Sequence, residues 1–350
     1  MKIGMLAPLW ERVPPEKYGG TELVVYNLTE ELVRRGHDVT LFASGDSITS
    51  AKLHSIRLRS LRAHPDQLNP NCYTMLHSAE CFRNADQFDL IHNHTGWNSV
   101  PMSSMVDTPT VTTLHDRVNK EGALIFRTYQ DHNVISISDS YRKCAPNLNY
   151  LATVYNGIDV DGFPFQEKPA DQPYLAFLGR FSFEKAPHLA IKVAKATGSR
   201  LKIGAKLPDN PNDEKYYKEM IEPQVDGDQI QYVGELGFEQ KVELLANAQA
   251  LLFPIQWDEP FGLVSVEALA CGTPVIACAR GAVTEILEEG KVGFLCKDEN
   301  DLINAVSRID KIDRAICRSY VEERFDVTAM TDGYLKAYSK ILKQPVVQVA

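Results

Sequence analysis

Two glutamates in the stretch WDEPFGLVSVEALACGTPVIA, residues 257–277, are of types and spacing that could do chemistry. Glu259 precedes an almost wholly apolar run, and Glu267 lies inside that run, eight positions later. A carboxylate in apolar surroundings is costly unless it has a partner. The two hydroxyls of a ribose could be that partner for Glu267, and a lysine or arginine of the same chain would serve equally well. The residues alone leave both interpretations open.

Two cations form a second candidate set, in YLAFLGRFSFEKAPHLAI at residues 174–191. Arg180 directly follows an apolar run, and Lys185 stands at the start of the next helical pattern. An arginine grips a diphosphate through its planar fork, whereas a lysine acts as a point charge. This stretch therefore predicts a diphosphate site; a pair of solvated surface cations is the alternative.

Glycines before helices supply a third kind of feature. Gly19 and Gly20 in KYGGTELVVYNL precede a helical pattern and would let the backbone approach a phosphate or sugar, although a plain turn also explains such a pair. The segment PFGL at 260–263 would likewise place backbone N–H groups at a helix start. No GxGxxG follows the first strand and no GxxxxGK[ST] occurs, which argues against a dinucleotide oxidoreductase and a P-loop NTPase. The DVD at 159–161 lies in a turn, and we interpret it as structural, with no metal site.

The elements that must position these residues alternate strand and helix along nearly the whole chain. Apolar strand-like runs occur at 2–9, 39–44, 89–94, 110–115, 133–138, 151–156, 174–179, 201–206, 230–234, 250–254, 274–279 and 292–296. Helical patterns separate them, as in TELVVYNLTEELVRRG, which Gly36 ends. Such alternation predicts an α/β protein with doubly wound, Rossmann-like parallel sheets. Ligands of such sheets bind beyond the carboxyl ends of the strands, where the candidate residues stand.

A polar, proline-bearing linker, FQEKPADQP at 165–173, interrupts this alternation. We therefore predict an N-terminal domain over 1–165 and a C-terminal domain over 166–325. The segment 326–350 is expected to be helical and to pack back on the N-terminal domain.

Composition narrows the class of protein. The chain has 350 residues, 44% of them hydrophobic, which suits two globular domains. Its net charge of −9 opposes nucleic acid or an anionic membrane as the main partner. The sequence has no membrane-length apolar run and no typical signal peptide, and its seven cysteines lack CxxC or zinc spacing, which predicts a cytoplasmic protein. The basic stretch KLHSIRLRSLRAH at 52–64 is a local exception, for which we favour a solvated face over a membrane or acidic-acceptor patch.

The Glu259-x7-Glu267 block with its PFGL and EALACGTPVIA resembles the signature of the retaining family-4 glycosyltransferases of GT-B fold. The likeness runs through most of the chain. It includes GGTE with RGHDVTLFA, IHNHTGW, TLHD, YNGID, GRFSFEK and ERFDVTAMTDGYLKAY. The resemblance implies two Rossmann-like domains facing each other across a cleft.

The resemblance also implies a role for each matching residue. Arg180 and Lys185 would neutralise the leaving diphosphate, and His115 would lie beside the donor sugar. Glu259 would bind hydroxyls of the transferred sugar, and Glu267 those of the ribose. The other donor-binding positions would be Gly19, Gly20, Tyr232, Val233, Phe261, Gly262 and Leu263. Asn156 and Gly157 would form the interdomain element. His94 and Trp97 would brace the acceptor side.

The sequence thus predicts a transferase that moves a hexose from a nucleoside diphosphate sugar to an acceptor hydroxyl, with retention and hence an α-linkage. We favour UDP-glucose as donor because it is common among relatives. The expected partners are this donor and a carbohydrate or small-molecule acceptor, with no cofactor, metal or nucleic acid and at most peripheral membrane contact. Two alternatives remain, a sugar-nucleotide epimerase on the same fold and a non-catalytic module that binds sugar nucleotides.

Overall fold

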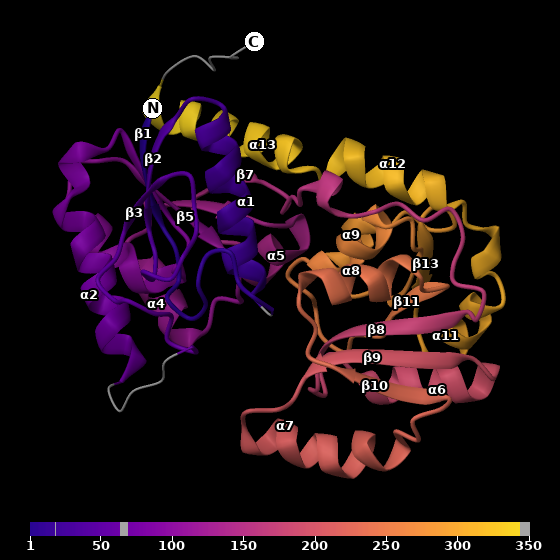
Figure 1. Ribbon diagram of the computed structural model, residues 1–350. Coiled ribbons are helices and arrows are strands. Elements are labelled where there is room, and N and C mark those ends of the chain that lie inside the picture. Colours follow the sequence, from indigo (N-terminus) through magenta and orange to yellow (C-terminus); the bar gives the residue numbers. More distant parts are fainter. Residues whose placement is uncertain (18, 64–68, 344–350) are drawn as a thin grey trace. The chain divides into compact units, whose positions relative to one another are not determined.

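The computed structural model describes residues 1–17, 19–63 and 69–343. The chain divides into two compact units, each built around one parallel sheet (Figure 1). Unit 1 contains residues 1–157 and the segment from residue 327 onward, and unit 2 contains residues 158–326. This arrangement confirms the α/β class with two Rossmann-like parallel sheets.

Unit 1 has a seven-stranded sheet in the order β3-β2-β1-β4-β5-β6-β7. Its strands are β1 (Lys2–Leu6), β2 (Asp38–Phe42), β3 (Lys52–His54), β4 (Leu90–Asn93), β5 (Thr110–Leu114), β6 (Asn133–Ser136) and β7 (Tyr150–Thr153). All neighbouring strands pair in parallel. Strands β4 and β5 are buried along their whole length, which explains why their sequences read as continuous runs rather than alternating ones.

Strand β3 is the one that the sequence analysis missed. It pairs with β2 at the edge of the sheet, and both Lys52 and Leu53 are exposed. A three-residue edge strand buries too little apolar surface to show a strand pattern. It lies in the basic stretch 52–64, of which His64 lies outside the described residues.

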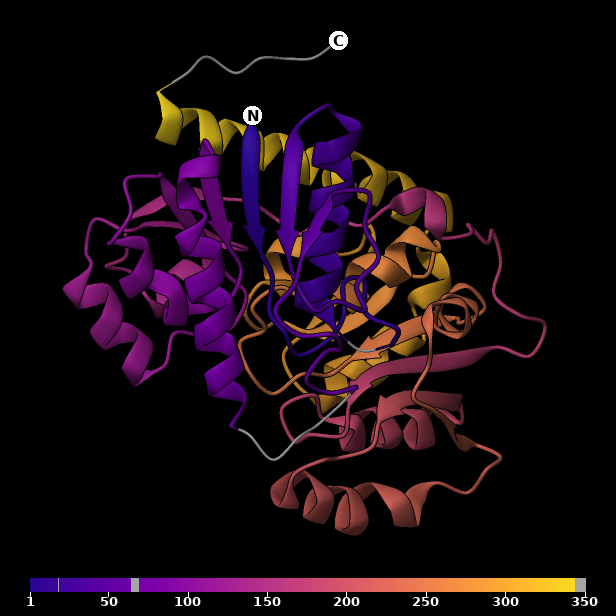
Figure 2. The same ribbon diagram turned by 60° about the vertical axis from the view of Figure 1, so that its left-hand side comes forward.

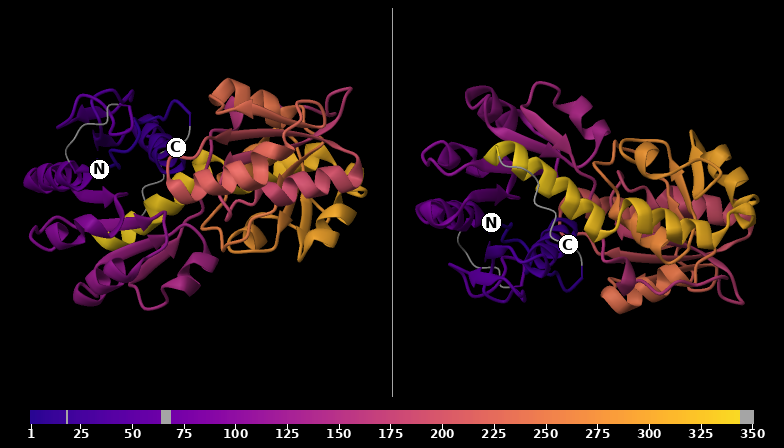
Figure 3. Two further views of the ribbon diagram at one scale, coloured as in Figure 1. Left: turned by 90° about the horizontal axis from the view of Figure 1, so that it is seen from below. Right: turned by 90° about the horizontal axis from the view of Figure 1, so that it is seen from above.

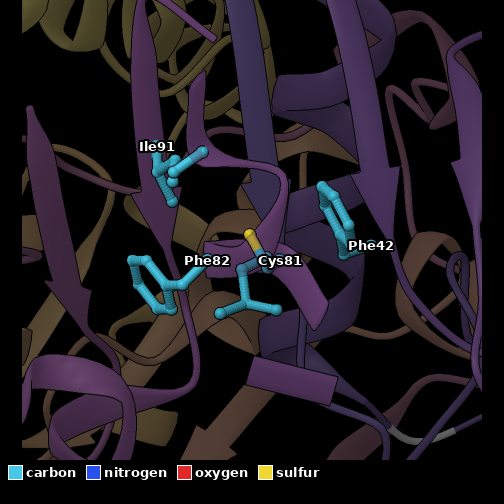
Figure 4. Close-up of a cluster of buried hydrophobic side chains, with 6 residues drawn as sticks. Phe42, Cys81, Phe82 and Ile91 are labelled. Carbon is cyan, nitrogen blue, oxygen red and sulfur yellow. The ribbon is translucent and has the colours of Figure 1, made fainter. Parts of the chain in front are cut away.

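The helices of unit 1 bury apolar side chains against the sheet. They are α1 (Gly20–Arg34), α2 (Pro70–Arg83), α3 (Val100–Ser103), α4 (Lys120–Thr128), α5 (Asp139–Cys144) and α13 (Val327–Leu342). Figure 4 shows one such cluster, in which Phe82 and Cys81 of α2 meet Phe42 of β2 and Ile91 of β4. Leu6 and Ala85 complete this core cluster.

Helix α13 joins the C-terminal segment to unit 1. It contacts α1 and β7, and its ribbon lies at the yellow end of the colour bar in Figure 3. Tyr334 and Tyr338 of α13 are fully buried. Arg35, just after α1, donates to the Asp332 carboxylate at 2.5 Å and to the Thr328 carbonyl at 3.1 Å. These contacts hold α13 in the fold of unit 1.

Unit 2 has a six-stranded sheet in the order β10-β9-β8-β11-β12-β13, again all parallel. The segments of this unit run from magenta through orange to yellow in Figure 2. Its strands are β8 (Tyr174–Arg180), β9 (Arg200–Lys206), β10 (Ile230–Gly234), β11 (Ala250–Phe253), β12 (Val275–Cys278) and β13 (Gly293–Cys296). Its helices are α6 (Pro187–Thr197), α7 (Pro211–Tyr216), α8 (Phe238–Ala246), α9 (Leu263–Ala270), α10 (Val283–Ile286), α11 (Glu299–Val306) and α12 (Arg314–Arg324). Across the described part of the chain, no helix is both long and apolar enough to cross a bilayer.

Candidate functional site

The carboxyl end of β8 carries the two predicted cations of unit 2. Arg180 is the last residue of β8. The sequence pattern predicted Lys185 at the start of the next helix, but the structure places it in the loop before that helix. Helix α6 begins only at Pro187, after Ala186 in the left-handed region at φ 54°. The Nε atom of Arg180 is buried and has no hydrogen-bond partner among the described residues. A guanidinium N–H in that state is available to an anion.

Lys185 and Glu259 form an ion pair with an Nζ–Oε2 distance of 2.6 Å. Trp257 Nε1 donates to the same carboxylate oxygen at 2.7 Å. The Lys185 ammonium also lies over the Trp257 ring, 5.1 Å from its centroid, which adds a cation–π contact. Glu259 is only 8% exposed, and these two donors satisfy its charge.

The backbone around Glu259 is held from two sides. Gln256 N–H donates to the Glu184 carbonyl at 2.7 Å, which ties the Glu259 loop to the Lys185 loop. On the other side, Ala282 N–H donates to the Glu259 carbonyl at 2.9 Å. A Cβ atom at Gly281 would lie 2.3 Å from the Glu259 nitrogen, so this close approach requires glycine. The sequence analysis missed both Trp257 and Gly281; the Trp257 position beside Glu259 was a usable signal, whereas a lone glycine gave none.

Helix α9 follows directly, and its first turn carries the predicted backbone donors. Gly262 caps the helix in the left-handed region at φ 95°, and Leu263 is the first helical residue. Phe261 is buried, with its ring centroid 6.0 Å from that of Phe325. The glycine therefore turns the chain into the helix, and its carbonyl accepts from the Ser265 N–H at 2.9 Å.

Glu267 of α9 has a partner within unit 2. Its Oε1 lies 2.5 Å from the Nζ of Lys241 in α8, so the intramolecular pair left open by the sequence is formed. Its Oε2 makes no hydrogen bond to any residue in the described part of the chain. Lys241 was missed because it stands 26 residues earlier in the chain, and only the fold brings the two together.

Tyr232 and Val233 lie on β10 at the edge of the same sheet. The Tyr232 hydroxyl donates to the Ala205 carbonyl at 3.0 Å, and its ring lies 5.3 Å from that of Phe181. Val233 is 39% exposed, so this strand end presents an apolar side chain to solvent.

In unit 1, Gly19 and Gly20 connect the loop after β1 to α1. Gly20 is the first residue of the helix, and a Cβ atom at Gly19 would lie 2.7 Å from the Cβ of Pro15. Glu22, in the first turn of α1, is 5% exposed and accepts a long bond of 3.4 Å from the Glu11 N–H. Burial raises the pKa of Glu22 from 4.5 to about 7.

We predict that Glu22→Gln stabilises the protein at neutral and alkaline pH. Since the pKa is raised, the folded state holds this proton longer than the unfolded state, and the carboxyl costs stability as pH rises through the window from 4.5 to about 7. The neutral amide removes a penalty of up to about 3 kcal/mol at about pH 8, and little at about pH 5. Urea midpoints of both proteins at the two pH values measure the difference. The exposed Glu16→Gln is the control and should change stability by only a few tenths of a kcal/mol; equal gains from Glu22→Gln at both pH values would contradict the prediction.

The predicted histidines of unit 1 lie together. His94, just after β4, and His115, just after β5, form an Nδ1–Nε2 hydrogen bond of 2.8 Å. Burial lowers the pKa of His115 to about 4 and holds that of His94 well below its usual range. Trp97 is packed against α4 instead, where a Cβ atom at Gly122 would lie 2.6 Å from the indole ring.

Asn156 and Gly157 end the first segment of unit 1. Gly157 N–H donates to the Met330 sulfur of α13 at 3.0 Å, and its carbonyl accepts from the Asn27 side chain at 3.2 Å. The Asn156 side-chain oxygen is buried and has no hydrogen-bond partner within residues 1–17, 19–63 and 69–343.

Family models match most of the chain. Residues 18–161 match the model described as "Glycosyltransferase Family 4", and residues 161–317 match "Glycosyl transferases group 1". The chain is 25% identical to the phosphatidyl-myo-inositol mannosyltransferase of Mycobacterium tuberculosis, covering 93% of this chain and 90% of that protein. It is 24% identical to the glycogen synthase of the same organism, covering 85% and 82%.

Solved structures show the same fold. The sucrose-phosphate synthase of Thermosynechococcus elongatus superposes with a TM-score of 0.80 at 21% identity, covering 98% of this chain and 99% of that one. HepE of Anabaena, solved in complex with UDP-glucose, superposes with a TM-score of 0.69 at 20% identity, covering 97% and 100%. The two family models, joined end to end over residues 18–317, identify this chain as a member of the family-4, group 1 glycosyltransferases of GT-B fold.

Proposed function

We propose that this glycosyltransferase moves a hexose from a nucleoside diphosphate sugar to an acceptor hydroxyl, with retention of configuration and an α-linked product. The observation that carries the proposal is the buried Arg180 Nε without a partner in the described chain, one loop away from the Lys185–Glu259 pair. A buried donor at a strand end, next to a second cation, suits a polyanionic ligand.

Transfer of the sugar depends chiefly on stabilisation of the leaving diphosphate. As the bond from the anomeric carbon to the phosphate oxygen breaks, negative charge develops on the diphosphate. We assign Arg180 and Lys185 to neutralise this charge. Lys185 has three N–H donors, so it can hold Glu259 and a phosphate oxygen together. The first N–H groups of α9 add partial positive charge on the same loop system.

Glu259 is assigned to hydroxyls of the transferred sugar, and Glu267 to the ribose diol. Lys241 occupies one Glu267 oxygen, and the other is available to a hydroxyl donor. We assign His115 to the donor sugar as well, and Gly19 and Gly20 to a close backbone approach to the phosphates.

Retention is assigned to a displacement on one face of the sugar. The acceptor oxygen bonds to the anomeric carbon as the phosphate leaves, and the acceptor proton passes to a phosphate oxygen. No carboxylate of the sequence is marked as a covalent nucleophile. We propose that the two cations, rather than a metal or cofactor, supply the positive charge.

UDP-glucose is our favoured donor, supported by its presence in the complex of the structurally similar HepE. The acceptor is proposed to be a carbohydrate or small molecule, with at most peripheral membrane contact. The relatives are named for different activities, among them a glycogen synthase and a phosphatidyl-myo-inositol mannosyltransferase.

Calorimetric titration with UDP-glucose, UDP-N-acetylglucosamine, GDP-mannose and ADP-glucose tests the proposal, followed by transfer to a panel of sugar acceptors. We expect micromolar binding of one donor and an α-linked product, assigned by NMR. Donor epimerised without acceptor would favour an epimerase, binding without any turnover would favour a non-catalytic module, and a trapped glycosyl–enzyme adduct would overturn the one-face displacement.

A further inference from the structure

A continuous chain of hydrogen bonds runs from His115 into the core of unit 1. His115 Nε2 bonds to His94 Nδ1 at 2.8 Å, and His94 Nε2 bonds to His92 Nδ1 at 3.2 Å. His92 Nδ1 also meets the Tyr338 hydroxyl at 2.7 Å, and His92 Nε2 meets the Thr113 hydroxyl at 2.7 Å. His92, Tyr338 and Thr113 are fully buried. The chain therefore links a predicted site residue to helix α13.

The three imidazoles are neutral in this environment. Burial holds the pKa values of His92 and His94 well below their usual range and lowers that of His115 to about 4. A neutral imidazole has one N–H donor and one bare nitrogen, so each bond in the chain fixes the next one.

Two buried hydroxyls set the direction of the chain. Within the described residues, His92 Nδ1 is the sole acceptor that the Tyr338 O–H reaches, so Nδ1 must be bare or a buried donor is lost. Independently, the Thr113 hydroxyl donates to Tyr334 Oη at 3.4 Å, which leaves its lone pair to accept from His92 Nε2. The Tyr338 contact requires the proton of His92 on Nε2, and the Thr113 hydroxyl can accept it there.

The rest follows ring by ring. His94 must donate from Nε2 to the bare His92 Nδ1, and its own Nδ1 is then bare. His115 must therefore donate from Nε2 to His94, which leaves its Nδ1 as a lone pair. That Nδ1 has no hydrogen-bond partner in the part of the chain that the structure describes, and His115 is only half-buried.

We infer that Tyr338 and Thr113, acting through His92 and His94, are positioning residues that fix the tautomer of His115, so that its Nδ1 accepts a hydrogen bond from a hydroxyl of the donor sugar. The second half of this inference rests on the proposed function, and the first half does not. The C-terminal helix would thereby contribute to the chemistry of the N-terminal unit without touching substrate.

NMR of the protein with isotope-labelled histidine tests the tautomer directly and without substrate. Long-range proton–nitrogen correlations show which ring nitrogen of His115 is protonated, and His115→Gln identifies its signals. We expect one tautomer, protonated on Nε2, in the unaltered protein. Protonation of His115 on Nδ1 would overturn the inference whether or not a donor is ever identified.

Tyr338→Phe then tests the anchor, since it removes one hydroxyl and keeps the ring. We expect the Nδ1–H tautomer of His115 to appear and kcat to fall by about 2- to 10-fold, the effect of one net hydrogen bond. Tyr174→Phe is the matched control, because its buried hydroxyl also donates one bond, to the Leu244 carbonyl at 2.9 Å, but lies in unit 2 outside the chain of bonds. If the tautomer of His115 is unchanged in Tyr338→Phe, Tyr338 does not anchor the chain of bonds. If the tautomer changes but kcat equals that of Tyr174→Phe, the tautomer has no role in sugar transfer.

Discussion

Replacing Arg180 by alanine is expected to lower kcat for sugar transfer by about 10²–10³-fold, or roughly 3–4 kcal/mol of barrier. Its buried Nε lacks a partner within the described residues, so the free protein loses no hydrogen bond from that atom on substitution. The loss should therefore appear in the transition state, where charge develops on the diphosphate, rather than in folding. Steady-state kinetics at saturating donor, together with the thermal midpoint, separate the two effects.

Lys185→Ala should lose kcat to a similar extent and also lose stability. It removes the ion-pair partner of Glu259 and leaves that buried carboxylate with the Trp257 N–H. Lys192→Ala is the matched control, because this cation stands on α6 and forms an exposed pair with Glu299 at 3.3 Å. Its kcat should change little. A loss below about threefold in Arg180→Ala or Lys185→Ala would contradict their role in stabilising the leaving group.

The fold was predictable from the sequence because parallel strands buried on both faces leave an apolar signature. Strand β12, for example, is wholly buried and reads as VIAC between two breaks. The edge strand β3 left no such signature, because two of its three residues face solvent. Helix α9 could also be predicted, since Gly262 stands directly before its apolar run and a turn follows Ala270.

The candidate site could be proposed from the sequence only where its residues stand close to one another in the chain. Arg180 and Lys185 stand five positions apart, and Glu259 and Glu267 stand eight positions apart, so their types and spacing could be read directly. Lys241 and Tyr338 could not, because each meets its partner through the fold, across 26 and 246 positions. Gly281 left no signal either, since its role depends on how closely the Glu259 backbone approaches it.

Glu267→Gln is expected to weaken binding of the nucleoside diphosphate sugar by about 10- to 100-fold, the worth of hydrogen bonds to a charged group. The same change should also destabilise the protein by about 1–3 kcal/mol, because the partly buried Lys241 would lose its charged partner. A loss of binding in this variant alone would therefore not distinguish a ribose ligand from a structural ion pair. Both interpretations predict damage.

The double variant Lys241→Met with Glu267→Gln distinguishes a carboxylate that binds the ribose from one that only pairs with Lys241. It removes both charges of the pair together, so most of the lost stability should return, since neutral replacements of such a pair are often tolerated. Affinity should not return, because the carboxylate that would accept the ribose hydroxyls is still missing. Calorimetry with the bound donor and thermal unfolding of the single and double variants give the two quantities side by side. If affinity recovers together with stability, Glu267 serves only to neutralise Lys241, and the ribose must be held elsewhere.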